Sequence, residues 1–156
     1  STPLRPDHVT VIVDRSASMG AITAQTYAGF LSALVDRLPE RTTIDVLAFA
    51  RLTTPILGSP ARGGQRGLSE RLAKAIVDIA PAPGSDLIAA LGAAADRLSA
   101  SRATSPAILV VTDGMLPEPD NAAALLAELA RRAGKSKPPD IVFVVSDPTL
   151  LAEGLR

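Results

Sequence analysis

Two acidic residues stand just behind apolar segments of the chain, and two serines follow the first of them. Asp14 comes directly after the apolar residues 9–13, with Ser16 and Ser18 two and four positions beyond it. Asp113 comes after a second apolar run that ends in a threonine. Carboxylate and hydroxyl oxygens are hard ligands, which suit Mg²⁺ or Mn²⁺ better than zinc. These residues predict a site for a divalent cation, with Mg²⁺ as the first choice and Mn²⁺ as the alternative.

The elements that would position these side chains follow from the hydrophobic pattern. Short β-branched runs predict strands that are buried on both faces, as in a parallel sheet. The expected strands are residues 8–13, 43–49, 107–111 and 140–145, with 51–57 as a short edge strand. Apolar residues at helical spacing predict helices over 22–38, 69–77, 87–98 and 122–133. We expect Ser69 to cap the second of these helices and residues 58–67, with four glycines, to form a loop.

Strands that alternate with helices predict an α/β fold, a doubly wound and mostly parallel sheet with helices on both faces. In such sheets ligands bind at the carboxyl ends of the strands, where the strand order reverses. The expected strands 8–13 and 107–111 would both end there. The two acids would therefore meet at one edge of the sheet.

The composition narrows the class of protein and the kind of site. The chain has 156 residues, 16 basic and 16 acidic side chains, one histidine and no cysteine. A net charge of zero argues against a nucleic-acid binder, and no apolar run is long enough to span a membrane. Without cysteine, and with one histidine, oxygen is the only plausible ligand type for a metal. We expect a cytoplasmic protein, and an extracellular location stays open.

A family resemblance becomes visible at this point. Asp14-x-Ser16-x-Ser18 looks like the D-x-S-x-S signature of the von Willebrand factor A (VWA) domain, and Asp113-Gly114 is similar to that family's later Asp-Gly element. Between them, the family has a loop that carries a threonine before a helix. Residues 83–91 occupy that place, with Ser85 at the position of the threonine.

The resemblance implies a Rossmann-like VWA fold with a metal-ion-dependent adhesion site (MIDAS). In it, Ser16 and Ser18 would ligate Mg²⁺ directly, and Asp14 and Asp113 would act mainly through waters or hydrogen bonds. Ser85 would bind the metal directly or through a water. The open coordination position would take a Glu or Asp carboxylate of a partner protein. Keeping charged ligands away from the metal leaves it electrophilic, so that an external anion binds more tightly.

The chain departs from the family pattern in three places. Ser85 lacks the methyl group that would restrict χ1 of a threonine. Asp86 adds an acid that would act either as a helix cap or as an acceptor behind the metal ligands. After residue 147 the family's last strand and helix are not recognisable. We therefore expect one VWA-like domain over residues 1–156, with its core at about 8–147, as part of a larger protein.

The function expected from this site is metal-dependent binding of a protein partner. Cytoplasmic bacterial VWA domains resemble adaptors of MoxR-type AAA+ ATPases, of chelatase-like systems or of conflict and defence systems, and the excess of arginine over lysine suggests a bacterial source. One alternative is a Mg²⁺-dependent phosphoryl-transfer enzyme with Asp14 as its nucleophile. Another is a scaffold with a vestigial metal site. The segment from Arg51 to Lys74 holds five basic residues, either as a solvated surface or as a docking face for an acidic partner.

Overall fold

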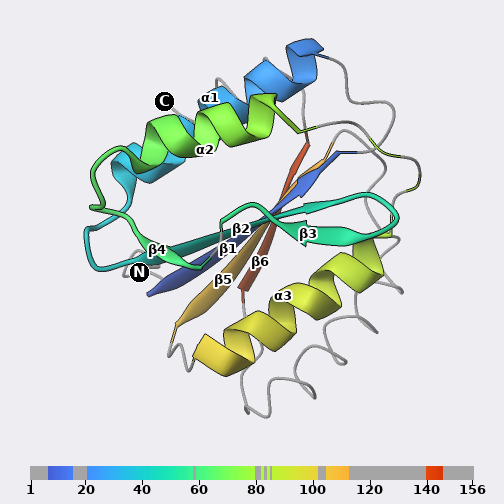
Figure 1. The fold of residues 1–156 in the computed structure, drawn as a ribbon. Coiled ribbons are helices and arrows are strands. Elements are labelled where there is room, and N and C mark those ends of the chain that lie inside the picture. Colours follow the sequence, from blue (N-terminus) through green and yellow to red (C-terminus); the bar gives the residue numbers. More distant parts are fainter. Residues whose placement is uncertain are drawn as a thin grey trace.

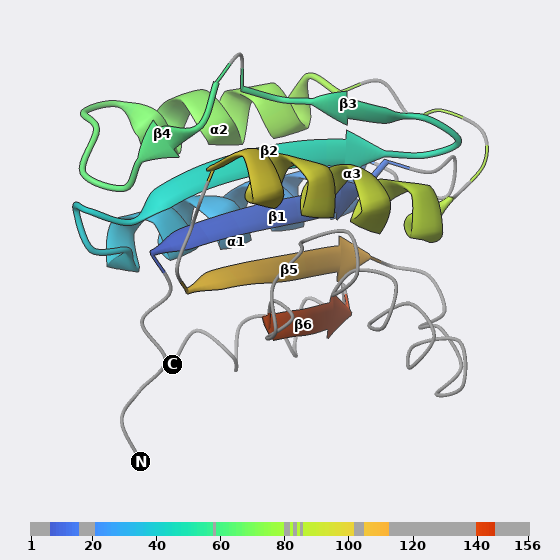
Figure 2. The same cartoon turned by 90° about the horizontal axis from the view of Figure 1, so that it is seen from below.

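The fold of the chain is a mixed sheet covered by helices on both faces (Figures 1 and 2). The computed structural model describes residues 7–15, 21–57, 59–79, 82, 84, 86–101, 105–112 and 140–145. Across these residues the strand order is β3-β2-β1-β5-β6, and β4 also pairs with β2. The strands are β1 (His8–Asp14), β2 (Thr43–Phe49), β3 (Thr53–Pro55), β4 (Ala61–Arg62), β5 (Pro106–Thr112) and β6 (Asp140–Val145).

The four long strands run parallel, and the two short ones run antiparallel to β2. β1 is the central strand and every one of its residues is buried, as the continuous apolar run predicts. The chain moves outward from β1 to β2 and β3 and later returns to β1's other side with β5 and β6. The doubly wound, mostly parallel α/β sheet is therefore confirmed, and its order reverses between β1 and β5.

The helices form two layers. α1 (Ala21–Arg37) and α2 (Leu68–Val77) lie side by side on one face, and α3 (Leu87–Ser101) covers the other (Figures 1 and 2). The hydroxyl oxygens of Ser32 in α1 and Ser69 in α2 lie 3.1 Å apart, within hydrogen-bond distance. Helices on both faces are thus confirmed. None of the helices described is long and apolar enough to cross a membrane.

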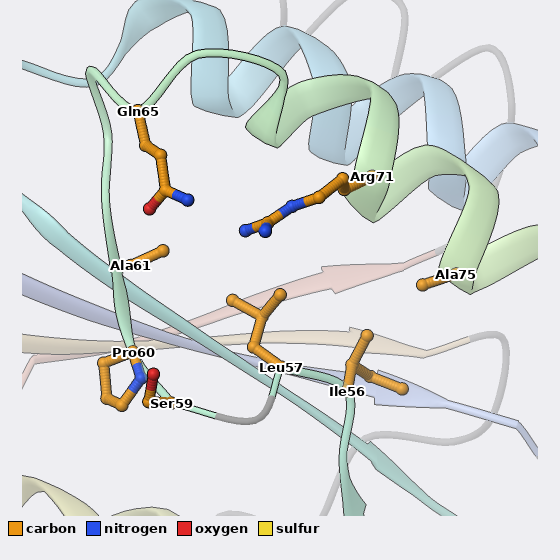
Figure 3. A pocket seen from close by; sticks show the side chains of 8 residues that line it. All are labelled: Ile56, Leu57, Ser59, Pro60, Ala61, Gln65, Arg71 and Ala75. Atoms are coloured by element: carbon orange, nitrogen blue, oxygen red, sulfur yellow. The ribbon is translucent and has the colours of Figure 1, made fainter.

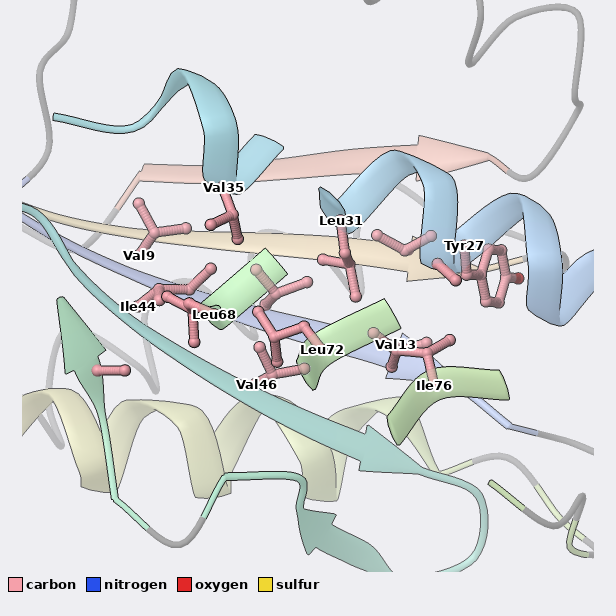
Figure 4. Packing of buried hydrophobic residues seen from close by; sticks show 14 residues of the cluster. Val9, Val13, Tyr27, Leu31, Val35, Ile44, Val46, Leu68, Leu72 and Ile76 are labelled. Carbon is pink, nitrogen blue, oxygen red and sulfur yellow. The ribbon is translucent and has the colours of Figure 1, made fainter. Parts of the chain in front are cut away.

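The larger core lies between the sheet and the pair α1 and α2, and Figure 4 shows it from close by. Alternate residues of the strands face it, because successive side chains of a strand point to opposite faces. α2 adds Leu68, Leu72 and Ile76, which are four residues apart and form its buried stripe. The residues that contribute from β1 and β2 are Val9, Val11, Val13, Ile44 and Val46.

The smaller core lies under α3 and takes the other residues of the same strands. Ile12 and Leu47 pack there against Leu91 and Leu98 of α3. Asp45 of β2 lies on this face and is fully buried, and Arg97 of α3 pairs with its carboxylate. This face therefore combines an apolar core with an ion pair whose carboxylate is buried.

The structure bears on three further expectations about the elements, and a fourth lies outside the described residues. The predicted cap Ser69 is wrong, because α2 begins at Leu68 after Gly67 and has no side-chain cap. The expected loop 58–67 contains β4, whose two residues are too few to give a period in the sequence. The expected edge strand 51–57 is confirmed in shortened form as β3, where Pro55 is tolerated at the edge. The helix expected over 122–133 lies outside the described residues.

Candidate metal centre

Asp14 occupies the last position of the central strand. It is 2% exposed, although it stands at the end of β1. The parallel registers pair Asp14 with Phe49 of β2 and Val13 with Val111 of β5. Asp14 therefore lies at the carboxyl edge of the sheet, beside the point where the strand order reverses, as the sequence predicts.

Backbone hydrogen bonds tie two further segments to the end of β1. The amide of Arg15 donates to the carbonyl of Phe49 at 2.8 Å, and the amide of Ala82 donates to the carbonyl of Arg15 at 3.0 Å. The amide of Asp86 donates to the carbonyl of Ala50 at 2.8 Å. The chain after β1, the chain after β2 and the chain before α3 thus meet at one edge. The structure thus brings Ala82 and Asp86 close to the end of β1.

Asp86 acts as the cap of α3. Its Oδ1 accepts a hydrogen bond from the amide of Ala89 at 2.9 Å, and its carbonyl accepts one from the amide of Ala90 at 3.1 Å. A carboxylate in this position satisfies an amide that the first turn of a helix leaves without a partner. Of the two roles open to Asp86, the structure shows the helix cap.

Gly84 is a residue of this edge that sequence reasoning did not single out. Its φ of +86° is a left-handed conformation that favours glycine, and a Cβ built on it would lie 2.9 Å from Cβ of Arg51. The dipeptide Pro83-Gly84 is a turn signal that could have identified it. Glycine here lets the segment before α3 approach the turn after β2.

The other four predicted ligands, Ser16, Ser18, Ser85 and Asp113, lie outside the described residues. The structure does describe chain that flanks them. Gly84 and Asp86 stand on either side of Ser85, and Thr112, the residue before Asp113, ends the strand next to β1. Within the described residues no three acidic or histidine side chains gather as metal ligands would. Of the predicted set, these residues include Asp14 alone.

The donors available at this edge suit a hard cation. Asp14 offers carboxylate oxygens, the chain has no cysteine, and His8 stands at the opposite end of β1. A seven-residue strand spans about 20 Å, so the imidazole of His8 is remote from Asp14. The site therefore has oxygen donors, which fit Mg²⁺ or Mn²⁺.

A comparison with protein families decides what this fold is. The model of the von Willebrand factor type A domain matches residues 9–115, more than half of the chain. The chain belongs to the von Willebrand factor type A family. The VWA match begins in β1 and ends just after Asp113, so it includes all five predicted ligands. No curated protein sequence matches the chain.

Solved structures of low sequence identity share the VWA fold. The manganese-loaded TRAP protein of Plasmodium vivax has a TM-score of 0.66 at 18% identity, over 96% of this chain and 63% of that one. A von Willebrand factor type A protein of Catenulispora acidiphila has 0.65 at 17%, over 96% and 41%. Proximal thread matrix protein 1 of the mussel byssus, with a zinc-occupied MIDAS motif, has 0.60 at 15%, over 95% and 46%. The chain thus spans less than two thirds of the length of each of these structures.

Proposed function

We propose that this chain is a metal-dependent protein-binding module. In this proposal, Mg²⁺ is held by Asp14, Ser16, Ser18, Ser85 and Asp113 and takes a carboxylate of a partner protein. The observation that carries the proposal is the buried Asp14 at the carboxyl edge of the sheet, with the chain after β2 and the start of α3 tied beside it. The VWA structures that hold manganese or zinc support a divalent metal here and leave the choice of metal open.

The chain's own residues would do two things at this site. Asp14, buried at the end of β1, offers a negative charge to the metal from a fixed strand. The serine hydroxyls are neutral donors, so the bound cation keeps most of its charge. When bound, Mg²⁺ would supply an open, electrophilic position for an oxygen of the partner.

The surface beside the site suits a protein ligand. Leu52, in the turn between β2 and β3, is 73% exposed, and Ile88, in the first turn of α3, is 67% exposed. Two backbone hydrogen bonds join these segments. The amide of Ala50 donates to the carbonyl of Leu52, and the amide of Asp86 donates to the carbonyl of Ala50. Two exposed aliphatic side chains therefore stand beside the metal edge. We infer that they contact the partner residues that flank the acidic side chain.

We propose binding, and not catalysis, as the function of this edge. Phosphoryl-transfer sites of this kind usually need a second acid two residues after the nucleophile, and this chain has Ser16 there. His8 is buried and remote, so it offers no general base to Asp14. The setting we propose is that of a cytoplasmic adaptor in a bacterial multi-protein system, such as one with a MoxR-type AAA+ ATPase, a chelatase-like system or a defence system.

Calorimetric titration with Mg²⁺ and Mn²⁺ tests the metal site. The double variant Ser16→Ala with Ser18→Ala removes two direct ligands, so we expect metal affinity to fall by at least about tenfold. Ser59→Ala is the matched control, because it deletes an exposed hydroxyl two residues before β4, which pairs with the start of β2 and not with its end; this variant should bind like the wild type. Unchanged affinity in the double variant would show that the site is assigned wrongly.

Two further measurements separate the module from its alternatives. Proteins captured from the native lysate with Mg²⁺, and lost both in EDTA and with Asp14→Ala, would be candidate partners. Capture that is indifferent to EDTA would instead favour a scaffold with a vestigial site. Turnover of a phosphomonoester that Asp14→Asn abolishes would favour the enzyme.

A further inference from the structure

A pocket lies between α2 and the chain that connects β3 to β4, on the flank of the sheet (Figure 3). Its volume is about 380 Å³. That lies within the range of small-molecule sites, roughly 300–1,000 Å³. The side chains that line it are Ile56, Leu57, Ser59, Pro60, Ala61, Gln65, Arg71 and Ala75.

The sequence builds this pocket from one side of α2. Leu68, Leu72 and Ile76 turn into the core, whereas Arg71 and Ala75, four residues apart, lie together on the neighbouring flank. Ala75 is short and leaves space between the helix and the opposite wall.

Apolar residues make up that opposite wall. Ile56 and Leu57 are half-buried and pack against the core. The amide of Ile56 donates to the carbonyl of Val46 at 2.8 Å, which ties the wall to the middle of β2. The pocket thus has an apolar wall fixed by the sheet edge.

Two polar groups converge on the space above this wall. Figure 3 shows the guanidinium of Arg71 and the carboxamide of Gln65 pointing toward each other across the pocket. Neither side chain makes an ion pair or hydrogen bond with any residue that the structure describes. The backbone holds Gln65 in place, since its amide donates to the carbonyl of Arg62 at 3.0 Å. Donors that face a pocket without a partner are available to a ligand.

Basic residues outnumber acidic ones in the chain from β4 to the end of α2. Between Ala61 and Val77 the acidic residue is Glu70, and the basic residues, all exposed, are Arg62, Arg66, Arg71 and Lys74. A concentration of one sign of charge attracts ligands of the other sign. The basic segment seen in the sequence is thereby divided, because Arg51 lies at the metal edge beside Gly84. Of the other four, Arg71 lines the pocket, and Arg62 lines a neighbouring hollow together with Glu40.

We propose that this pocket binds a carboxylate that carries a short aliphatic chain, either as a free acid or as the C-terminal residue of a peptide. The guanidinium of Arg71 donates to the carboxylate oxygens, in the geometry at which arginine binds carboxylates with two hydrogen bonds. The carboxamide nitrogen of Gln65 can donate as well. The aliphatic chain lies against Ile56 and Leu57.

This site would be independent of the metal. β4 pairs with Thr43 and Ile44, at the start of β2, whereas the metal edge lies at the end of that strand. Ligand binding in the pocket should therefore persist in EDTA. The proposal of this pocket does not depend on the proposed metal function.

Amide chemical shifts of the full chain, titrated in EDTA with isocaproate and with N-acetyl-Gly-Gly-Leu, test the proposal. We expect the amides of Gln65, Arg71 and Ala75 to shift with both probes. Isocaproamide and the amidated peptide, which lack the carboxylate, should bind at least about tenfold more weakly. The probe with the higher affinity identifies the natural source, a free acid or a chain end.

Three variants locate the binding. Arg71→Met keeps the aliphatic stem and should weaken binding by about tenfold, as expected for a lost charge-assisted hydrogen bond. Arg66→Met removes a neighbouring positive charge that does not line the pocket and should change affinity by less than about twofold. Ala75→Leu fills the pocket and should weaken binding of both probes while Arg71 stays in place. Thermal unfolding of each variant shows that the fold is retained.

Several results would overturn the proposal. One is the absence of shifts at Gln65, Arg71 and Ala75 with either probe at millimolar concentration. Another is equal binding of the amides and the carboxylates. A third is an equal loss of affinity in Arg66→Met and Arg71→Met, which would indicate a diffuse attraction to surface charge.

Discussion

The two faces of the sheet are built differently, although the same strands make both. On the face covered by α1 and α2, the buried residues of β1 and β2 are all apolar. On the face covered by α3, Ile12 and Leu47 are apolar. Nearer the starts of the same strands, this side carries the buried polar residues His8, Thr10 and Asp45. Apolar packing stabilises the first face, whereas the second face combines apolar packing with an ion pair.

The polar group on the α3 face depends on one long side chain. The register places Thr10 opposite Asp45, with His8 two residues earlier on the same side of β1. Among the described residues, Nε2 of His8, Oγ1 of Thr10 and Oδ1 of Asp45 have no hydrogen-bond partner. The guanidinium of Arg97 binds the other carboxylate oxygen of Asp45. A buried charge is costly unless it is paired, so this face depends on Arg97.

The largest effect should come from removing Arg97. Arg97→Met leaves the carboxylate of Asp45 buried without its partner, and we expect a loss of about 3 kcal/mol in the free energy of unfolding. This is the low end of the range for such changes, because Arg97 is partly exposed. Urea denaturation measures it.

The double variant Asp45→Leu with Arg97→Met is the matched test of the comparison. It converts the α3 face to the apolar chemistry of the other face, and we expect it to recover most of the lost stability. If Arg97→Met alone is as stable as the wild type, the ion pair is not what holds this face.

The strands differ in how well the sequence predicts them, and the ion pair explains one of the differences. β1, β5 and β6 are continuous apolar runs, so their pattern alone predicts buried parallel strands. β2 gives a weaker pattern because Asp45 interrupts it. The partner that allows Asp45 to be buried is 52 residues away, and no local pattern contains it. Likewise, β4 exists because two residues pair with β2, not because of their own propensity.

The candidate site also has features that the sequence predicts and features that depend on contacts between distant segments. The position of Asp14 follows from the end of an apolar run in a parallel sheet, and the structure places it there. The role of Asp86 was open, because the cap bond to Ala89 depends on where α3 starts. Gly84 is needed because the backbone passes close to Arg51, a contact between distant segments. Ser16, Ser18, Ser85 and Asp113 stay predictions, since they lie outside the described residues.

A smaller effect should come from the way the helices begin. α3, on the polar face, has the side-chain cap of Asp86, whereas α2, on the apolar face, starts at Gly67 without one. Asp86→Ala should lower the free energy of unfolding by about 1 kcal/mol. Glu70→Ala, which removes an acid from the first turn of α2, is the matched control and should cost only a few tenths of a kcal/mol. Equal losses would mean that the cap bond adds nothing to α3.

The last prediction concerns His8 and tests the electrostatics of the α3 face. Its effect on stability at neutral pH should be the smallest of these changes. Burial lowers the pKa of His8 below its ordinary value of 6.5, the carboxylates of Asp45 and Asp7 oppose this, and Arg97 adds to the lowering. The unfolded chain then binds a proton more readily than the folded chain, so stability is full above pH 6.5 and falls as the pH drops below it. His8→Gln does not titrate, and its unfolding free energy should fall less between about pH 7.5 and about pH 5.5.

If acid instead stabilised the wild type relative to His8→Gln, the carboxylates would dominate over burial. In Arg97→Met the loss of the cation should raise the pKa of His8 and reduce the wild-type slope, which links this measurement to the ion pair.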